Sequence, residues 1–333
     1  MTRARMLLLL LLLMGSLSAA ASTPNDQQQC DNPNTQLLRV FVLRHGETNA
    51  NADGIIQGSA DFSRLTELGK QQAAQVVQSF YDDDIAPIGI DSVYVSPLTR
   101  AQDTYKILRE NILSLSSEST AVLPTTATTL QNLREIDFYD WTGHNKPYLI
   151  ANYPDSYTAW ERGDPYKLMV YNTKQEENAK SSGHEIQQHY PLLELWDRAN
   201  QVWQEIMDLE DPKIMKASTA NSNNNNKPHC LLLVAHGSLG QALLGTAMGW
   251  DATQFRNHAF PNCGMAEIQW HLPLHSSISK LGSSSSSRPL ASQWRWKWPI
   301  RADEPNHNAW KTLETTTTTR TAATAQTTQE AQP

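Results

Sequence analysis

The sequence contains few of the residues that build cross-linked, zinc-bound or heavily glycosylated proteins. Cysteine occurs only three times in 333 residues, as Cys30, Cys230 and Cys263. Three cysteines cannot make a dense disulfide framework, and their spacing does not match a zinc motif. No Asn-x-Ser/Thr acceptor occurs, so nothing predicts heavy N-glycosylation. These absences argue against a disulfide-stapled domain and against a cysteine-based metal site.

Charge is also scarce, and its balance is mildly negative. Charged residues make up 18% of the chain and the net charge is -7, where about a quarter of residues is usual. We therefore expect no nucleic-acid partner, and an anionic substrate would need a local basic pocket. His271 and His275 have a four-residue spacing, but Pro273 between them would disrupt a helix. No nucleotide-binding glycine loop is present, so we expect no metal and no cofactor.

The one long apolar run lies at the N-terminus. Residues 2–5 are basic in character, residues 6–14 are apolar throughout, and residues 16–22 are mostly small. This is the pattern of a secretory signal peptide, and the run is too short to cross a bilayer comfortably. We predict that residues 1–22 are a cleaved signal peptide, with an uncleaved anchor as the alternative. The protein is then expected in the secretory pathway or secreted, with no membrane contact after cleavage.

Short apolar runs alternate with helical patterns in the rest of the chain. Runs rich in Val and Leu predict buried strands at 37–43, 91–95 and 231–235, with further strands at 265–270 and 293–298. Apolar residues at helical spacing predict helices at 66–80, with Thr66 as its N-cap, 98–113, 192–207 and 239–248. This alternation predicts an α/β three-layer sandwich, a mostly parallel sheet with helices on both faces.

Changes in composition divide the chain further. We predict a flexible segment at 23–36, a single domain at 37–300, and a disordered tail at 301–333 that is rich in Thr, Ala and Gln. Within the domain, residues 145–190 are expected to form a cap or insert. Residues 218–228 and 276–290 are predicted to be low-complexity loops because they contain runs of Asn or Ser. The sequence predicts no oligomeric state.

Polar clusters follow three of the predicted strands directly. The first strand leads into Arg44 and His45, the second into residues 96–100, which end in Arg100, and the third into His236. Ligands of open α/β sheets bind at the carboxyl ends of the strands. If the three strands are neighbours, two arginines and two histidines meet in one crevice.

Such a cluster suits the transfer of a phosphoryl group. Guanidinium groups bind phosphate oxygens in a fixed fork and stay charged at any working pH. A neutral imidazole among them can attack phosphorus, while the cations stabilise the charge on the equatorial oxygens. A nearby carboxylic acid can then protonate the leaving group. Gly46, next to the histidine, is expected to let the backbone approach the ligand.

These motifs, in this order, resemble those of the histidine phosphatase superfamily, whose members include phosphoglycerate mutases and many small-molecule phosphatases. The resemblance covers about residues 38–298 and is carried by Arg44-His45-Gly46-Glu47-Thr48, Gln57-Gly58, Leu65-Thr66-Glu67-Leu68-Gly69, Ser96-Pro97-Leu98-Thr99-Arg100-Ala101, Leu133-Arg134-Glu135-Ile136-Asp137 and Val234-Ala235-His236-Gly237. It implies a phosphoglycerate mutase-like fold and a small phosphorylated metabolite as the partner.

The resemblance also assigns a role to each matched residue. His45 would become phosphorylated, and Arg44, Arg100 and His236 would hold the phosphoryl oxygens. Glu135 would protonate the leaving group and then activate water. The substrate side would be lined by Asn51, Gln57, Gly58 and Gly237. Asp137 is a rival of Glu135, because in a strand both side chains would face the same side.

A narrower resemblance is to the plant 2-carboxy-D-arabinitol-1-phosphatases, chloroplast enzymes that act on a sugar-acid monophosphate. It is carried by Glu135-Ile136-Asp137-Phe138-Tyr139, Gly183-His184, Tyr190-Pro191, Glu194-Leu195-Trp196-Asp197-Arg198-Ala199 and Asn262-Cys263-Gly264. It implies a phosphatase for a small sugar or sugar-acid phosphomonoester, and it adds a plastid, reached through the secretory pathway, as an alternative location. The alternative activities are a phosphoglycerate mutase-type transfer and a binding protein that has kept the fold.

Overall fold

The computed structural model describes residues 35–82, 85–115, 122–173, 187–220, 227–273, 290–298 and 311–312. The predicted signal peptide at 1–22 and most of the predicted flexible segment at 23–36 lie outside these ranges. The Ser-rich loop predicted at 276–290 also lies outside them, apart from Leu290.

A seven-stranded sheet organises the described part of the chain, in the order β3-β2-β6-β1-β7-β8-β9. The four strands β3, β2, β6 and β1 pair in parallel, whereas β8 is antiparallel to both β7 and β9. The strands of this sheet are β1 (Thr35–Arg44), β2 (Ser92–Val95), β3 (Thr128–Thr129), β6 (His229–Ala235), β7 (Met265–Pro273), β8 (Gln293–Trp298) and β9 (Lys311–Thr312). The five predicted strands are therefore confirmed. A separate small sheet consists of β4 (Val170–Tyr171) and β5 (Gln188–His189).

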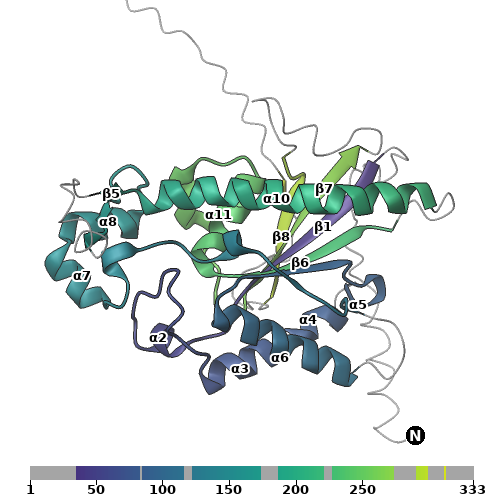
Figure 1. The fold of residues 1–333 in the computed structure, drawn as a ribbon, viewed down its shortest axis with the longest axis horizontal. Helices are drawn as coiled ribbons and strands as arrows, with labels where there is room; N and C mark the ends of the chain where they lie inside the picture. The colour runs from purple at the N-terminus through teal and green to yellow at the C-terminus, as the bar shows by residue number, and fades with distance from the viewer. Residues whose placement is uncertain are drawn as a thin grey trace, which may run out of the picture. The chain divides into compact units, whose positions relative to one another are not determined.

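Helices cover both faces of the sheet, as Figure 1 shows for α10 and α11 on one face and α3, α4 and α6 on the other. The longer helices are α3 (Glu67–Gln75), α4 (Val77–Asp82), α6 (Thr99–Leu115), α7 (Lys146–Asn152), α8 (Pro154–Arg162), α10 (Pro191–Ala220) and α11 (Gly237–Ala247). Shorter turns are α2 (Asn49–Ala52), α5 (Ile85–Ile88) and the 3-10 helices η1 (Gln131–Leu133), η2 (Tyr139–Trp141) and η4 (Ala252–His258). The predicted three-layer α/β architecture is confirmed.

The side chains of β1 alternate between two apolar clusters, one on each face of the sheet. Leu38, Val40 and Val42 pack in the cluster that contains α10 and α11. Phe41 and Leu43 pack in the cluster that contains α3 and α6. All five side chains are fully buried. A parallel strand that is buried on both faces needs a nearly continuous apolar run, which is the pattern that identified this strand in the sequence.

The helix predicted at 192–207 is longer in the structure, because α10 continues to Ala220 with Pro212 inside it. Glu210, three residues beyond the predicted end, is fully buried and accepts hydrogen bonds from Tyr94 and Lys213. These partners hold the additional turns against the sheet. The low-complexity loop predicted at 218–228 is therefore wrong at its start, since its first three residues are helical.

Apart from Lys311 and Thr312, the predicted disordered tail at 301–333 lies outside the described residues. Lys311 and Thr312 form β9, which pairs with Trp294 and Gln293 of β8. An unpaired sheet edge exposes backbone donors and acceptors, and a returning strand satisfies them. The ammonium group of Lys311 also lies 4.8 Å from the centre of the Trp294 ring.

Within the described part of the chain, no helix combines the length and apolar composition that a membrane span needs.

Candidate active site

The parallel pairing of β1, β6 and β2 brings the predicted phosphate-binding residues to one edge of the sheet. Arg44, the last residue of β1, pairs with Ala235, the last residue of β6. His45 and His236 therefore follow neighbouring strand ends, and Ser96 follows the end of β2 on the other side of β6. The crevice at the carboxyl ends of the strands lies where the sequence predicted it.

The two imidazoles face each other inside the protein. His45 is 3% exposed and His236 is fully buried, and their ring centres lie 5.2 Å apart. The carbonyl oxygen of Gly46 lies 2.7 Å from His45 Nδ1. A carbonyl can only accept a hydrogen bond, so Nδ1 carries the hydrogen and Nε2 keeps its lone pair. Burial, together with the charges of Arg44 and Arg100, holds the pKa of His45 well below its usual value. His45 is therefore a neutral imidazole with a lone pair on Nε2.

Arg44 is held between two elements beside these imidazoles. Its Nη1 donates to the carbonyl oxygen of Phe260 at 2.6 Å. Its guanidinium group also packs on Gly237 at the start of α11, where an added Cβ would lie 3.3 Å from Cζ. A side chain at this position would crowd the guanidinium group, which explains the glycine that follows His236. Burial lowers the pKa of Arg44, but an arginine stays charged in proteins.

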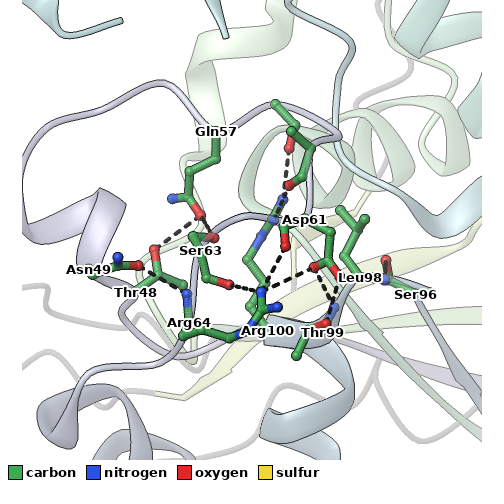
Figure 2. A network of polar contacts seen from close by, with 12 residues as sticks. Thr48, Asn49, Gln57, Asp61, Ser63, Arg64, Ser96, Leu98, Thr99 and Arg100 are labelled. Atoms are coloured by element: carbon green, nitrogen blue, oxygen red, sulfur yellow. Dashed lines mark hydrogen bonds and ion pairs between the residues drawn. The ribbon is translucent and has the colours of Figure 1, made fainter. Parts of the chain in front are cut away.

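Arg100 enters the site from the first turn of α6 and is 1% exposed. Its Nη1 donates to the carbonyl oxygen of Ala60 at 2.9 Å, and its Nη2 donates to that of Gly58 at 2.8 Å. Figure 2 shows how the segment that contains these two carbonyls bends around the guanidinium group. Asp61 in the same segment accepts hydrogen bonds from Thr99 at the start of α6. Burial lowers the pKa of Arg100 to about 10, which still leaves it a cation at neutral pH.

Three donors or acceptors in this cluster have no partner within the described part of the chain. They are Arg44 Nε, Arg100 Nε and His236 Nδ1, and all three atoms are buried. Buried polar atoms without a partner are rare in proteins and call for an explanation. Two guanidinium groups and an imidazole with unused nitrogens would match a ligand that carries several negative oxygens. The geometry thus fits a phosphoryl group.

Glu135 lies at the same place, on the N-terminus of α11. Its carboxylate accepts hydrogen bonds from the backbone N–H groups of Ser238 and Leu239, both at 3.0 Å, and from that of Ile136 at 2.9 Å. The charge of Glu135 also acts on both arginines of the site, since it raises their pKa values. The start of α11 therefore carries His236 and holds Glu135 next to it.

Asp137 is separated from Glu135, although the sequence interpretation placed both on one face of a strand. The structure has no strand at residues 134–138, so the two side chains take different directions. Arg198 donates to Asp137 at 2.8 Å and Ser59 donates to it as well. Burial raises the pKa of Asp137, but the Ser59 hydrogen bond and the charges of Arg198 and Arg134 outweigh it and hold the pKa below its usual value. Asp137 is thus an anion held by Arg198 and Ser59, whereas Glu135 lies at the start of α11 next to His236.

Asn51 and Gln57 use their side-chain oxygens to fold the loop after His45. Asn51 Oδ1 accepts from the backbone N–H of Thr48 at 3.2 Å and from Asn262 Nδ2 at 3.2 Å. Gln57 Oε1 accepts from the hydroxyl groups of Thr48 and Ser63, as Figure 2 shows. Asn51 belongs to the short helix α2, and Gln57 directly precedes Gly58, whose carbonyl accepts from Arg100. The contacts that the structure gives both residues are within the protein.

Gly46 allows a close backbone contact that the sequence did not predict. An added Cβ would lie 2.4 Å from the carbonyl oxygen of Gly69, and an added Cβ on Gly69 would lie 2.0 Å from that of Glu47. The close approach that Gly46 allows in the structure is to the backbone of α3. The pair of glycines lets the start of α3 press the His45 loop against the strand ends.

Sequence reasoning did not single out Ser96 and Arg198. Ser96 is fully buried, and its hydroxyl group lies 2.7 Å from His236 Nε2. Arg198 donates from Nη2 to the carbonyl oxygen of Glu135 at 2.9 Å as well as to Asp137. The signal for Ser96 was its place directly after a buried strand, beside the predicted cluster.

Among the described residues, no group of three or more His, Cys, Asp or Glu side chains could hold a metal ion.

A sequence profile of the histidine phosphatase superfamily (branch 1) matches residues 40–273. The chain belongs to this superfamily. It is 31% identical over 232 residues to the probable 2-carboxy-D-arabinitol-1-phosphatase of Arabidopsis thaliana, an alignment that covers 70% of this chain and 38% of that relative. It is 26% identical over 267 residues to phosphoglycerate mutase 3 of Saccharomyces cerevisiae, covering 68% of this chain and 85% of that relative.

A solved structure shares the fold of this superfamily member. The structure described as mycobacterial hydrolase 2 aligns with a TM-score of 0.52 and 20% sequence identity, covering 78% of this chain and 89% of that chain. At this identity the likeness concerns the fold alone. The chain spans little more than a third of the length of the plant relatives that it matches.

Proposed function

We propose that the chain is a phosphatase that hydrolyses a small sugar or sugar-acid phosphomonoester through a phosphohistidine on His45. The observation that carries this proposal is a set of buried nitrogens without partners beside the ends of β1, β2 and β6. Among the residues that the structure describes, Arg44 Nε, Arg100 Nε and His236 Nδ1 have no hydrogen-bond partner, and the neutral His45 beside them keeps a lone pair on Nε2. Membership in the histidine phosphatase superfamily supports the same reaction class.

In the first step, His45 Nε2 attacks phosphorus and forms the N–P bond while the ester P–O bond breaks. The pair of electrons from that bond leaves with the ester oxygen, which takes a proton from the Glu135 carboxylic acid. Arg44, Arg100 and His236 hold the three equatorial oxygens, where the charge spreads in the transition state. The products of this step are a free alcohol, a phosphorylated His45 and the Glu135 carboxylate.

In the second step, a water molecule attacks the phosphorylated imidazole. The Glu135 carboxylate takes a proton from the water as the new P–O bond forms, and the N–P bond breaks. The electron pair of that bond returns to His45 Nε2, and inorganic phosphate leaves. Both steps need the same carboxyl group in alternating protonation states, which is why one well-placed carboxyl suffices.

The residues of the cap favour hydrolysis over a mutase reaction. A mutase must hold a bisphosphate, which calls for unpaired cations above the pocket. Within the described residues of the cap, Lys146 lies 3.8 Å from Glu161 and Lys167 lies 3.6 Å from Asp164. Two of its three described cations therefore face carboxylates. The name of the Arabidopsis relative supports a sugar-acid phosphate as the substrate class.

The test follows phosphate release and isomer conversion together. The purified protein is incubated with a panel of sugar and sugar-acid monophosphates, including 2-carboxyarabinitol 1-phosphate and both phosphoglycerates. Free phosphate without isomer conversion is the expected result, and the best substrate defines the specificity. Isomer conversion with little free phosphate would replace the proposal with a mutase. No turnover of any compound, with no acid-labile phosphate on His45, would argue for a binding protein.

We also propose that residues 1–22 direct the chain into the secretory pathway. The support is the basic start, the apolar run and the small residues that follow it. Expression of the full chain with a C-terminal fluorescent protein is the test. Retention in the cytosol would contradict it, and signal in a plastid would favour the alternative destination.

A further inference from the structure

We propose that Ser96 is a positioning residue that fixes the tautomer of His236, so that the Nδ1–H is the hydrogen offered to the phosphoryl group. This inference rests on the proposed function, because a donor at this point serves the phosphoryl oxygens. It adds a residue that reaches the reacting group only through His236.

The placement of Ser96 is rigid. It follows β2 directly, it is fully buried, and its backbone N–H donates to the carbonyl oxygen of Val234 at 3.0 Å. Its Oγ lies 2.7 Å from His236 Nε2 and also accepts from the backbone N–H of Leu98 at 3.3 Å. Two neighbouring parallel strands thus carry the two members of this hydrogen bond, so strand pairing fixes their distance.

The direction of this hydrogen bond follows from counting donors and acceptors. A serine hydroxyl has one hydrogen and two lone pairs. The N–H of Leu98 occupies one lone pair. Over the residues that the structure describes, His236 Nε2 is the one acceptor found for the hydroxyl hydrogen of Ser96. Ser96 therefore donates to Nε2, and Nε2 carries no hydrogen.

The remaining hydrogen of the ring must then be on Nδ1. Burial and the charges of Arg100, His45 and Arg44 hold the pKa of His236 well below its usual value, so the ring is neutral and has a single N–H. Nδ1 is buried and has no partner among the described residues. A neutral ring with its hydrogen on Nε2 would instead turn a lone pair towards the site and repel a phosphoryl oxygen.

His45 and His236 would thereby have complementary roles in one tautomeric form. Both rings hold their hydrogen on Nδ1, but different atoms fix it. The carbonyl of Gly46 accepts from Nδ1 of His45, which leaves a lone pair on Nε2 for attack. The hydroxyl of Ser96 donates to Nε2 of His236, which leaves the N–H on Nδ1 for binding. One ring is prepared as the nucleophile and the other as a donor.

The direct test is the protonation state of the His236 ring nitrogens. The protein is labelled with ¹⁵N-histidine, and the side-chain signals of His236 are assigned by their loss in a His236→Gln variant. The wild type is expected to show the hydrogen on Nδ1, and Ser96→Ala is expected to shift the signals towards a mixture of both tautomers. A hydrogen on Nε2 in the wild type, or unchanged signals in Ser96→Ala, would overturn the proposal.

The kinetic test uses Ser96→Ala, Ser96→Thr and a matched control. Ser79→Ala removes another buried hydroxyl group. Ser79 is 2% exposed and donates to the carbonyl oxygen of Val76, three residues earlier in the chain. Losing one preorganised donor costs roughly 10²- to 10³-fold in kcat. Because Ser96→Ala removes the donor from only part of the molecules, we expect kcat to fall by about tenfold or more, with a smaller change in KM. Ser79→Ala should match the wild type.

The two measurements separate this inference from the proposed function. Recovery of kcat in Ser96→Thr, which keeps the hydroxyl group, supports a positioning role. A kcat of Ser96→Ala within twofold of the wild type would overturn it. If the wild type releases no phosphate from any substrate while His236 shows the expected tautomer, the proposed function fails and the Ser96–His236 assignment stands.

Discussion

Strand β6 begins with one histidine and is followed directly by another, and the two histidines differ in the charges around them. His229 begins the strand, with Nε2 at 2.7 Å from Glu210 and Nδ1 at 3.5 Å from Asp91. Lys213 and Tyr94 share the same Glu210 carboxylate. This group of polar residues, which we call the Glu210 cluster, places Lys213 and His229 against carboxylates.

The site at the other end of β6 has the opposite balance. His236 is surrounded by Arg44, Arg100 and His45, and the carboxylate of Glu135 is held by backbone N–H groups of α11. Burying charges is costly unless they are paired. Within the described residues, the Glu210 cluster pairs its polar groups with one another, whereas Arg44 Nε, Arg100 Nε and His236 Nδ1 have no hydrogen-bond partner, as expected of a site that binds an anion. The following variants test that contrast, from the largest expected effect to the smallest.

The nucleophile should give the largest effect. His45→Ala removes the nitrogen that forms the N–P bond, so we expect kcat to fall by about 10⁴-fold or more. Phosphate release and acid-labile phosphate on the protein measure it. Thermal unfolding serves as the control, because the variant should stay folded. Activity near that of the wild type would refute a phosphohistidine on His45. The proposed role of Arg44 and Arg100 in holding the phosphoryl group would then lose its support.

The acid should give the second largest effect, and it depends on the leaving group. Glu135→Gln cannot donate a proton, so kcat for alkyl phosphates should fall by about 10²- to 10⁴-fold. An aryl phosphate leaves without protonation, so its first step should be nearly normal and phosphorylated His45 should accumulate. Quenched-flow trapping of the phosphoprotein measures this.

Asp137→Asn is the matched control for Glu135→Gln. It removes a carboxylate two residues away that is held by Arg198 and Ser59. We expect a loss of stability and no change in the dependence on the leaving group. If Asp137→Asn instead shows the larger effect with alkyl phosphates, Asp137 is the acid.

Sequence reasoning predicted the parts of this architecture that depend on local pattern. Apolar runs predicted the buried strands, and Thr66 was correctly predicted as the N-cap of α3. Its hydroxyl group accepts from the backbone N–H of Gly69 at 3.0 Å. Arg44, His45, Arg100 and His236 were predicted to meet because parallel strand ends share an edge. That step needed only the order of motifs and the assumption that the strands are neighbours.

Contacts between distant segments could not be predicted in the same way. The last turns of α10 depend on Glu210 meeting Tyr94, which lies 116 residues earlier. The reason for Gly46 is its contact with Gly69, and β9 is visible only from its pairing with β8. Asp137 was read as a rival of Glu135 on the same side of a strand, because the sequence does not show that Arg198 turns it away.

Breaking the Glu210 cluster should affect stability and leave catalysis intact. Burial raises the pKa of Glu210, but hydrogen bonds from His229, Lys213 and Tyr94 outweigh it and lower the pKa from 4.5 to about 2. A shift of this size corresponds to about 3 kcal/mol of unfolding free energy. Glu210→Gln should lose this amount at pH 7, with kcat and KM unchanged.

The pH dependence of that loss has a defined sign. A carboxylate whose pKa is lower in the folded state stabilises the protein above its unfolded pKa and ceases to do so as the pH falls. The difference between wild type and Glu210→Gln should therefore be constant above about pH 5 and shrink from about pH 4.5 towards pH 2. Urea unfolding across this range measures it. A difference that grows with acidity would mean that the carboxyl is buried in its protonated form.

The smallest effect distinguishes a paired cation in the Glu210 cluster from one on the surface. Lys213 and Lys70 each lie three residues after a glutamate on a helix, with Nζ–Oε1 distances of 2.8 and 2.6 Å, and their side chains are 51% and 50% exposed. Their partners differ, because Glu210 is 0% exposed and Glu67 is 83% exposed.

Lys70→Ala should therefore lower the free energy of unfolding by less than about 0.5 kcal/mol, as exposed pairs do. Lys213→Ala should lower it by about 1 kcal/mol, because Glu210 keeps Tyr94 and His229 as partners. Raising salt from about 0.05 to about 0.5 M should remove the Lys70 effect and leave most of the Lys213 effect. Equal losses in urea unfolding would mean that Glu210 is screened by solvent, and the contrast between the two ends of β6 would then rest on the arginines of the site alone.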